Sequence, residues 1–286
     1  MRRGVFVGLA TLDVIHRVSH RPGPDEKVTA SWQGWAAGGP ATNAAVTHAA
    51  LGGDATLVTA LGRGHLAGLV AAELADHGVR VVDATPDLDL DLAVSAITVL
   101  EDTGERAVVS RDAAAHRVTP PAELAAILDA ADTLLVDGHH PHLAVAAADL
   151  ARRAGAEVTV DAGRWKPVFA DLMPLADVAI CSTSFRFPDA ATAADTAAHG
   201  LGLGLRMLAI THGADPVRWW NREGSGEVPV PAVTAVDTLG AGDALHGAWC
   251  FAEGDDPSRL AFGVDVAARR VTRVGPRDWL SLLPPS

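Results

Sequence analysis

The chain has 286 residues, of which 49% are hydrophobic, so it can bury the core of one large α/β domain or of two small ones. Its formal net charge of −12, with only two lysines, argues against a nucleic-acid-binding face, and neither Lys27 nor Lys166 stands in the frame of a Walker-type nucleotide site. Cys181 and Cys250 lack metal-ligand spacing, and no apolar run has the length of a membrane span or the form of a signal peptide, which predicts a cytoplasmic protein with reduced thiols and no membrane partner.

The N-terminal segment predicts a buried strand over Gly4–Leu9 that runs toward Asp13. The glycine fingerprint G-x-G-x-x-G of dinucleotide-binding proteins is missing after this strand, which argues against an oxidoreductase. The next segment, 14–35, alternates apolar and polar residues around a Pro-Gly-Pro-Asp turn at 22–25. That pattern predicts an antiparallel hairpin.

A pair of glycines, Gly38 and Gly39, precedes a predicted helix over 41–51 that is closed by Gly52 and Gly53. Glycines at this place let a polar ligand approach the backbone, and the amide of Asn43 offers a donor and an acceptor to hydroxyl groups. Taken alone, the pattern is equally consistent with the plain start of a helix.

The middle of the chain alternates strand and helix patterns, which predicts a mostly parallel sheet layered by helices. The predicted strands are 55–61, 79–82, 133–137, 157–161, 177–181 and 206–211, and the predicted helices are 66–77, 121–131, 143–154, 168–175 and 190–203. Two further strands, 93–100 and 106–111, flank the turn 101–105. Together with the 14–35 hairpin they predict a small β lid that covers a substrate.

Two loops that follow predicted strands carry polar side chains. Gly138-His139-His140-Pro141-His142 is compatible with a metal site, but Pro141 breaks the helical spacing and no acid completes the set, so we favour a loop in which His139 lines a pocket. In the second loop, Arg164 and Lys166 stand within reach of a phosphate, but a solvated loop is the preferred interpretation.

The octet Val236-Asp237-Thr238-Leu239-Gly240-Ala241-Gly242-Asp243 precedes a helix-like run of small and apolar residues. A Gly-Ala-Gly turn at a helix start leaves backbone N–H groups unpaired, and the helix dipole favours an anion there. The carboxylate of Asp243 would stand beside that anion and accept a proton from a hydroxyl. A tight turn with a capping acid would give the same short motif.

The octet, the G-G-x-x-x-N segment and Asp13 occur in one order, and together they resemble the ribokinase-like (PfkB) carbohydrate kinases, in particular the ketohexokinase and sulfofructose kinase branches. The resemblance implies one ribokinase-like domain over 1–286, with an α/β fold whose lid is formed by about 14–35 and 93–111. It implies Asp243 as the catalytic base and the Gly240, Ala241 and Gly242 amides as an anion hole.

The resemblance also implies binding residues. We expect the sugar to contact Asp13, Gly38, Gly39, Asn43, His139 and, from the lid, Lys27 and Arg111. We expect ATP near Ser182, Thr211, Gly213, Ala268 and Val271. Mg²⁺ is implied as a cofactor, and parts of the family also bind a monovalent cation such as K⁺ near Asp237 and Thr238.

Two positions depart from the family pattern. The N-x-x-E motif linked to magnesium is replaced by Ser182 and Phe185, and Pro216 stands where many relatives carry glycine. We expect ATP-dependent phosphorylation of a small sugar, a ketose or a related carbohydrate, by a homodimer joined through the lid. A nucleoside kinase of the same fold and a catalytically weak sugar sensor remain as alternatives, although 5% aromatic residues and no tyrosine argue against a pocket for a second base.

Overall fold

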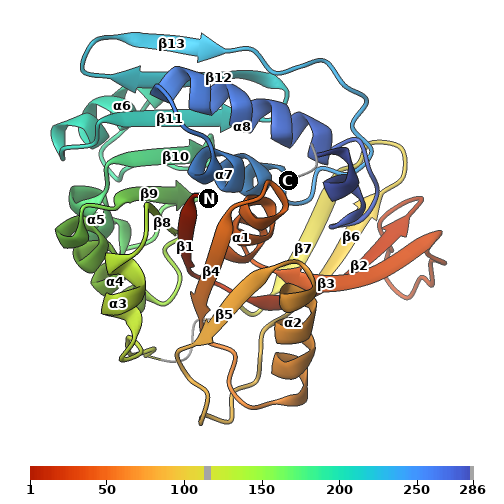
Figure 1. Ribbon diagram of the computed structural model, residues 1–286. Coiled ribbons are helices and arrows are strands. Elements are labelled where there is room, and N and C mark those ends of the chain that lie inside the picture. The colour runs from red at the N-terminus through yellow and green to blue at the C-terminus, as the bar shows by residue number, and fades with distance from the viewer. Residues whose placement is uncertain (113–116, 284–286) are drawn as a thin grey trace.

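The computed structural model describes residues 1–112 and 117–283, which form two β-sheets and the helices around them (Figure 1). In this part of the chain the larger sheet has nine strands in the order β13-β12-β11-β10-β9-β8-β1-β4-β5. Their bounds are β1 (Arg3–Val7), β4 (Asp54–Thr59), β5 (Val79–Asp83), β8 (Thr133–Val136), β9 (Glu157–Ala162), β10 (Val178–Ser182), β11 (Met207–His212), β12 (Asp215–Asn221) and β13 (Ser225–Val228).

The sheet is parallel from β11 to β5, which confirms the mostly parallel α/β fold. Only the edge is antiparallel, where β12 and β13 follow β11 as a meander that the sequence pattern had not predicted. Strand β8 is fully buried along its length, as expected for a central strand of a parallel sheet with both faces covered.

Helices cover both faces of this sheet. Helices α3 (Leu124–Asp129), α4 (Pro141–Ala154), α5 (Phe169–Leu172) and α6 (Ala193–Gly202) lie on one face, and α1 (Pro40–Ala50), α2 (His65–Asp76), α7 (Ala241–Phe251) and α8 (Asp256–Arg270) on the other. Each face of the sheet packs with its helices into a hydrophobic core, the first core on the α3–α6 side and the second on the α1, α2, α7 and α8 side. Alternate residues of a strand point into different cores, so Val5 and Val7 pack in the first and Phe6 in the second.

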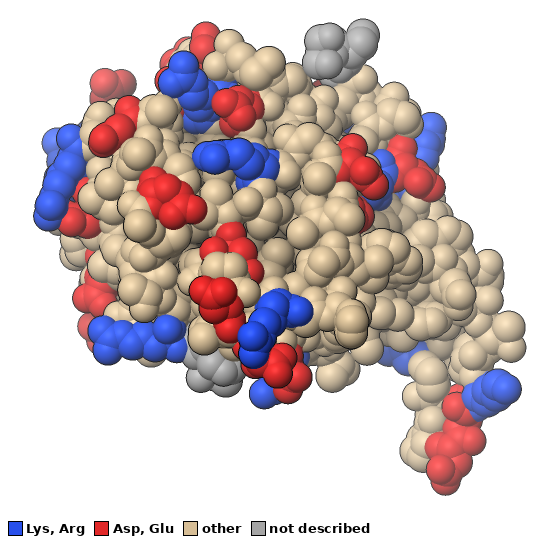
Figure 2. Space-filling view, turned by 60° about the horizontal axis from the view of Figure 1, so that its bottom comes forward, with Lys and Arg blue, Asp and Glu red and all other residues tan. Residues whose placement is uncertain are grey.

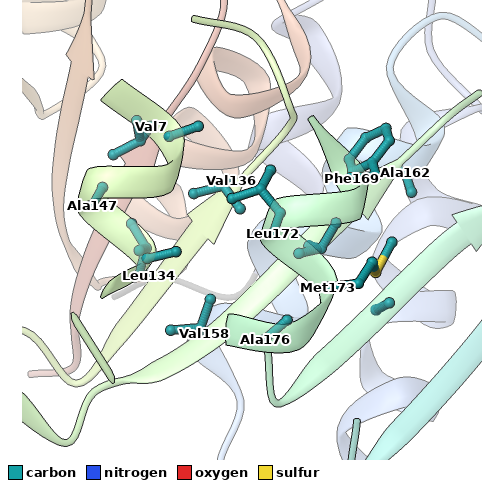
Figure 3. Close-up of a cluster of buried hydrophobic side chains, with 14 of the residues drawn as sticks. Val7, Leu134, Val136, Ala147, Val158, Ala162, Phe169, Leu172, Met173 and Ala176 are labelled. Atoms are coloured by element: carbon teal, nitrogen blue, oxygen red, sulfur yellow. The ribbon is translucent and has the colours of Figure 1, made fainter. Parts of the chain in front are cut away.

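The first core is packed closely because one helix presents alanines to the sheet. Figure 3 shows Leu134, Val136 and Val158 of the sheet meeting Ala147 of α4 and Leu172 of α5. All the inward alanines of α4 are fully buried, so the helix approaches the strands with little side chain between them.

The second sheet is small and has four strands among the described residues, in the order β3-β2-β6-β7. Its strands are β2 (Thr11–Val18), β3 (Trp32–Gly38), β6 (Val94–Leu100) and β7 (Arg106–Ser110). The pairs β2–β3 and β6–β7 are antiparallel, which confirms both predicted hairpins, and a parallel β2–β6 pairing joins them. In Figure 1 this sheet projects from one side of the molecule.

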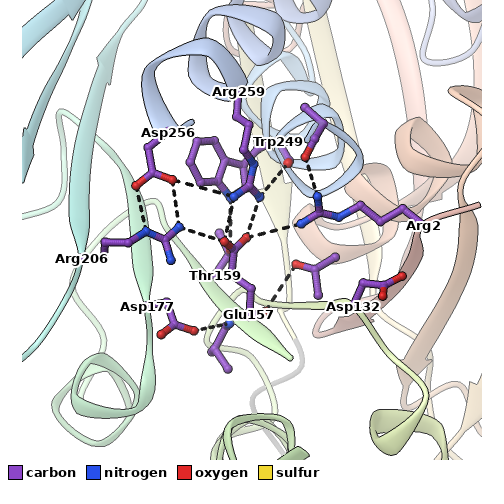
Figure 4. Close-up of polar contacts among 12 residues, drawn as sticks. Arg2, Asp132, Glu157, Thr159, Asp177, Arg206, Trp249, Asp256 and Arg259 are labelled. Atoms are coloured by element: carbon purple, nitrogen blue, oxygen red, sulfur yellow. Dashed lines mark hydrogen bonds and ion pairs between the residues drawn. The ribbon is translucent and has the colours of Figure 1, made fainter. Parts of the chain in front are cut away.

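A charge cluster built around the buried side chain of Arg259 ties the start of β9 to α8. Figure 4 shows Arg206 and Arg259 converging on the carboxylate of Glu157. Arg206 donates one hydrogen bond of 2.8 Å to it, and Arg259 donates two, of 2.7 and 2.6 Å. Burial opposes ionisation of Glu157, but hydrogen bonds and ion pairs with Arg259 and then Arg206 hold its pKa at about 2. This cluster therefore fixes α8 against the start of β9.

The surface mixes charges of both signs. On the face drawn in Figure 2, Lys and Arg side chains are scattered among Asp and Glu and are not gathered into a basic patch. Within residues 1–112 and 117–283, no helix is both long enough and apolar enough to span a membrane. Cys181 and Cys250 are buried, free thiols, as the sequence predicts.

Candidate active site

A cleft with a volume of about 530 Å³ lies between the carboxyl ends of the parallel strands and the inner face of the small sheet. The large sheet contributes Asp161, Ser182 and Thr211 from the ends of β9, β10 and β11. The small sheet contributes Asp13 and Ser95, which are cross-strand neighbours in β2 and β6. Carboxyl ends of parallel strands are the usual place for a ligand in such folds.

The first turn of α7 opens into this cleft. Gly240 is the N-cap residue with φ of +73°, a left-handed conformation that glycine adopts without strain. The N–H groups of Gly242 and Asp243 lie in the first turn and have no acceptor within the helix, so they and the helix dipole favour an anion in the cleft. The N–H of Ala241 instead turns back toward the carbonyl oxygen of Thr238, at 3.4 Å.

The carboxylate of Asp243 is held by Asn43, whose Nδ2 donates a hydrogen bond of 2.8 Å to Oδ2. The other end of this amide is also fixed, because Nη1 of Arg277 donates to Oδ1 of Asn43 at 3.1 Å. Arg277 in turn is held by the carbonyl of Ala37 at 2.7 Å and by Glu73 at 2.8 Å. The orientation of the Asn43 amide is therefore set by Arg277, and its NH₂ group faces Asp243.

Asp243 has the properties of a base that works near neutral pH. Burial raises its pKa to about 7, and the neighbouring carboxyl of Asp161 adds to the rise, while the hydrogen bond from Asn43 opposes it. Burial also raises the pKa of Asp161. His246 follows one turn further along α7, with Nδ1 2.7 Å from the Gly242 carbonyl oxygen and 3.6 Å from Oδ2 of Asp161. A base with its pKa near the working pH is well suited to accept a proton.

A second carboxylate, Asp13, faces the same cleft from the small sheet. The hydroxyl of Thr11 donates to it at 2.6 Å; burial raises its pKa, while hydrogen bonds from Thr11 and Ser95 oppose the rise. The two glycines are required here for space, because a Cβ on Gly38 would collide with the Asp13 carboxylate and a Cβ on Gly39, whose φ is +106°, with the Leu9 carbonyl. An ordered, buried carboxylate of this kind can accept hydrogen bonds from sugar hydroxyls.

The structure brings half of the predicted site residues together in this cleft. The cleft is lined by Asp13, Gly39, Asn43, His139, Ser182, Thr211, Gly240, Gly242 and Asp243, and Gly38 abuts Asp13. The predicted residues that do not line it are Lys27, Arg111, Gly213, Ala268 and Val271, together with Ala241, whose N–H turns toward Thr238, and the Asp237–Thr238 pair described below.

Physical reasons account for these exceptions. Lys27 is exposed on the loop between β2 and β3, and Arg111 is exposed and pairs with Asp91 at 3.4 Å. Ala268 is buried in the core, and the carbonyl of Val271 accepts the N–H of Val236 at 2.8 Å. Gly213 is an exposed turn residue with positive φ.

Several cleft residues were not predicted from the sequence: Arg106, Asp161, Lys166 and His246. Lys166 was expected in a solvated loop, but its Nζ donates to the Asp137 carbonyl at 3.1 Å and lies 3.1 Å from Nε2 of His139. Asp161 could have been predicted from the sequence, since it stands at the carboxyl end of a predicted parallel strand, where ligands usually bind. His246 could also have been predicted, because it lies three residues after Asp243 and therefore on the same face of the helix.

The expected monovalent-cation site at Asp237 and Thr238 does not fit this structure. Oδ2 of Asp237 accepts hydrogen bonds from Nη2 of Arg270 at 3.3 Å and from the N–H of Gly275 at 3.0 Å, and Oδ1 accepts from the N–H of Leu239 at 2.9 Å. The hydroxyl of Thr238 donates to the carbonyl of Gly104 at 3.0 Å. The charge of this carboxylate is thus already balanced by a guanidinium within the chain.

The departure from the N-x-x-E pattern also has a structural counterpart. Phe185 is fully buried and packs edge-on against Phe169 and Phe187, with ring centroids 5.6 and 5.2 Å apart. A carboxylate at this position would lose its solvation inside an aromatic cluster. Over the described residues, no group of three or more His, Cys, Asp or Glu side chains is placed to hold a metal ion, the 138–142 loop included.

Comparison with known proteins shows which family the chain resembles along nearly its whole length. Residues 1–281 match the model of the pfkB family carbohydrate kinases. The chain is 30% identical to an ATP-dependent ribose-1-phosphate kinase from Halopiger xanaduensis, over 97% of this chain and 95% of the relative. It is 26% identical to the ribokinase of Bacillus subtilis, over 94% and 89% of the two chains. The fold is similar to that of a ribokinase from Thermotoga maritima, with a TM-score of 0.80, 24% identity, and coverage of 100% and 96%.

Proposed function

The chain belongs to the pfkB family of carbohydrate kinases, and from this premise we propose that it transfers the γ-phosphoryl group of ATP to a hydroxyl of a small sugar, with Asp243 as the general base. The observation that carries this proposal is the position of Asp243. Its buried carboxylate, held by Asn43, lies in the first turn of α7, where it shares one cleft with Asp13 and with the free amides of the helix start.

The acceptor hydroxyl would approach Oδ1 of Asp243, because Oδ2 is engaged by Asn43. Asp13 would accept hydrogen bonds from other hydroxyls of the same sugar. Gly39 has no side chain, so the sugar could approach the backbone closely there. A base with a pKa of about 7 is partly ionised at neutral pH and can take the hydroxyl proton as the new bond forms. Positioning then supplies most of the remaining rate.

The transferring phosphoryl group would lie against the N–H groups of Gly242 and Asp243. Arg106 reaches this region from β7, where Nη1 donates to the Thr238 carbonyl at 3.2 Å, and it adds positive charge on the side of the small sheet. Ser182 and Thr211 would line the nucleotide side of the cleft. Mg²⁺ carried on the ATP phosphates would supply further positive charge there, since the described residues provide no metal cage of their own.

For the acceptor we propose a ketose or a related small sugar. The relative that acts on ribose 1-phosphate adds a sugar phosphate to the candidates. Lys166 lines the cleft and carries an ammonium group that could meet an anionic substituent, although burial lowers its pKa. Arg106 offers a second positive charge in the same cleft.

We also propose that the protein is a homodimer joined through the outer face of the small sheet. An apolar row crosses all four strands on this face, from Trp35 through Val14 and Ala96 to Val109, each paired with the next. Trp35 is 48% exposed and Val109 75% exposed. A second copy would cover both this row and the sheet edges. Light scattering on the purified chain tests the dimer, and a monomer that persists at high concentration would refute it.

The test of the proposed function is ADP release with Mg-ATP across a panel of ketoses, aldoses, ribose 1-phosphate, sulfosugars and nucleosides. Turnover on a sugar or sugar phosphate, with the phosphate found on one hydroxyl of the product, would support the proposal. Turnover on nucleosides alone would indicate a nucleoside kinase. Thermal stabilisation by a sugar without ADP release would indicate a sugar sensor.

A further inference from the structure

The segment that forms the anion-binding turn is anchored by one buried carboxylate. Asp237 is 1% exposed and binds three separate pieces of backbone or side chain: the turn itself at Leu239, the loop after α8 at Gly275, and the side chain of Arg270 at the end of α8. The N–H groups of Val236 and Asp237 add a backbone link to the carbonyl of Val271, at 2.8 and 3.3 Å. The position of Gly240 and of the α7 amides therefore depends on this anchor.

Among the described residues, the cation that pairs with Asp237 is the guanidinium of Arg270, which is 2% exposed. Its Nη2 donates to Oδ2 of Asp237 and its Nη1 to the carbonyl oxygen of Arg273, at 3.2 Å. Burial lowers the pKa of Arg270 while Asp237 opposes that shift, and a guanidinium stays charged under such conditions. The group lies directly behind the turn, since a Cβ placed on Gly240 would be 4.0 Å from its Nε.

A carboxylate oxygen and a backbone carbonyl oxygen are also what a hard monovalent cation would use as ligands. Such an ion could bind Asp237 only by displacing Arg270 or by joining it, and two positive charges in one buried site repel strongly. The guanidinium thus supplies the positive charge that a bound ion would supply, and it cannot dissociate because it is part of the chain.

We propose that Arg270 is a built-in cation that holds the anion-binding turn in place, so that this chain needs no monovalent metal ion for phosphoryl transfer. Arg270 acts as a positioning residue in this proposal, through Asp237 and Gly240, and does not touch the substrate. The proposal rests on the proposed kinase function for its kinetic part only.

The first test compares the wild-type chain in potassium, sodium and tetramethylammonium salts at equal ionic strength. We expect kcat and the thermal midpoint to be the same in all three. A kcat that rises with K⁺, or a thermal midpoint that K⁺ raises above that in tetramethylammonium, would overturn the proposal. The thermal measurement remains valid even when no acceptor sugar is found, so it separates failure of this inference from failure of the proposed function.

The second test removes the guanidinium. In Arg270→Ala, we expect kcat to fall by about 10²-fold with ATP still bound, because the amides lose their fixed position. K⁺ or free guanidinium should then enter the vacated space beside Asp237, raise the thermal midpoint, and restore kcat by about tenfold. Undiminished kcat of this variant in tetramethylammonium would contradict the inference, as would a loss that neither ion restores.

Two further variants keep the test decisive. Arg270→Lys retains the positive charge and should keep more activity than Arg270→Ala without any response to K⁺. Arg269→Ala removes the neighbouring arginine, which is 45% exposed and pairs with Asp265 at 2.9 Å, and should leave both kcat and its lack of K⁺ response unchanged. If Arg270→Ala fails to fold, the lysine variant and the wild-type salt series still decide the matter.

Discussion

Nδ2 of Asn43 lies 2.8 Å from Oδ2 of Asp243, although 200 positions separate the two residues in the chain. This contact joins the first turns of α1 and α7, and it holds one oxygen of the Asp243 carboxylate while the other has no side-chain partner among the described residues. The chemistry proposed for this cleft depends on that pairing, because a fixed carboxylate is what converts a nearby hydroxyl into an oriented nucleophile.

Arg277→Ala should weaken the base without unfolding the chain. Without the guanidinium, the Asn43 amide can turn over and present its oxygen to Asp243, so we expect kcat to fall by about tenfold or more. The loss of the donated hydrogen bond should also raise the pKa of Asp243 and move the acidic limb of the pH–rate profile to higher pH. Arg273→Ala is the matched control, since that exposed side chain donates only to the Thr272 carbonyl among the described residues. An unshifted pH profile for Arg277→Ala would show that Arg277 has a structural role only.

Asp161→Asn should shift the same limb in the opposite direction. Asp161 contributes to the raised pKa of Asp243, which is about 7, and its removal should lower that pKa. Because the base must be ionised, kcat/KM is expected to rise through pH 7 in the wild type and at lower pH in the variant. The measurement is the pH dependence of kcat/KM, with the exposed Asp171→Asn as control. A limb that stays in place would exclude the coupling between the two carboxyl groups.

The charge cluster around Arg259, at the start of β9, should matter for stability. Glu157→Gln removes the nearest carboxylate from the buried guanidinium of Arg259 and leaves it the more distant Asp256 at 3.9 Å, so we expect it to cost about 3 kcal/mol in urea unfolding. Asp149→Asn, which breaks an exposed pair with Arg153, should cost about 0.5 kcal/mol or less. The pKa of Glu157 is depressed in the folded state, so the stabilisation is present above about pH 4.5 and is lost as the pH falls toward 2. Equal costs for the two variants would contradict this assignment.

The parts of the site that the sequence predicts are those with a local signal. Gly39, Asn43 and Asp243 stand next to helix starts, where the glycine requirement and the free amides are visible in a few neighbouring residues. The large sheet was equally visible from its alternating strand and helix patterns. The edge strands β12 and β13 were missed because they add to the sheet as a short meander without a helix between them.

Side chains placed by tertiary contacts gave no such signal. Arg277 reaches Asn43 only because the loop after α8 folds back over α1, and nothing near Arg277 in the sequence indicates that partner. Arg111 is a further case. The structure shows that Arg106, Val108 and Ser110 of β7 face the cleft, so the alternation of side chains continued past Ser110 turns Arg111 away from it, but the sequence does not show which face of the strand meets the cleft.

The measurement that tests the central assignment most directly is ADP release by Asp243→Asn beside the wild type, on the acceptor that the panel identifies. Asparagine keeps the shape of the side chain but cannot take a proton, so we expect kcat to fall by at least about 10²-fold while ATP still stabilises the fold against heat. Turnover close to that of the wild type would show that Asp243 is not the base, and would contradict the mechanism proposed for this cleft.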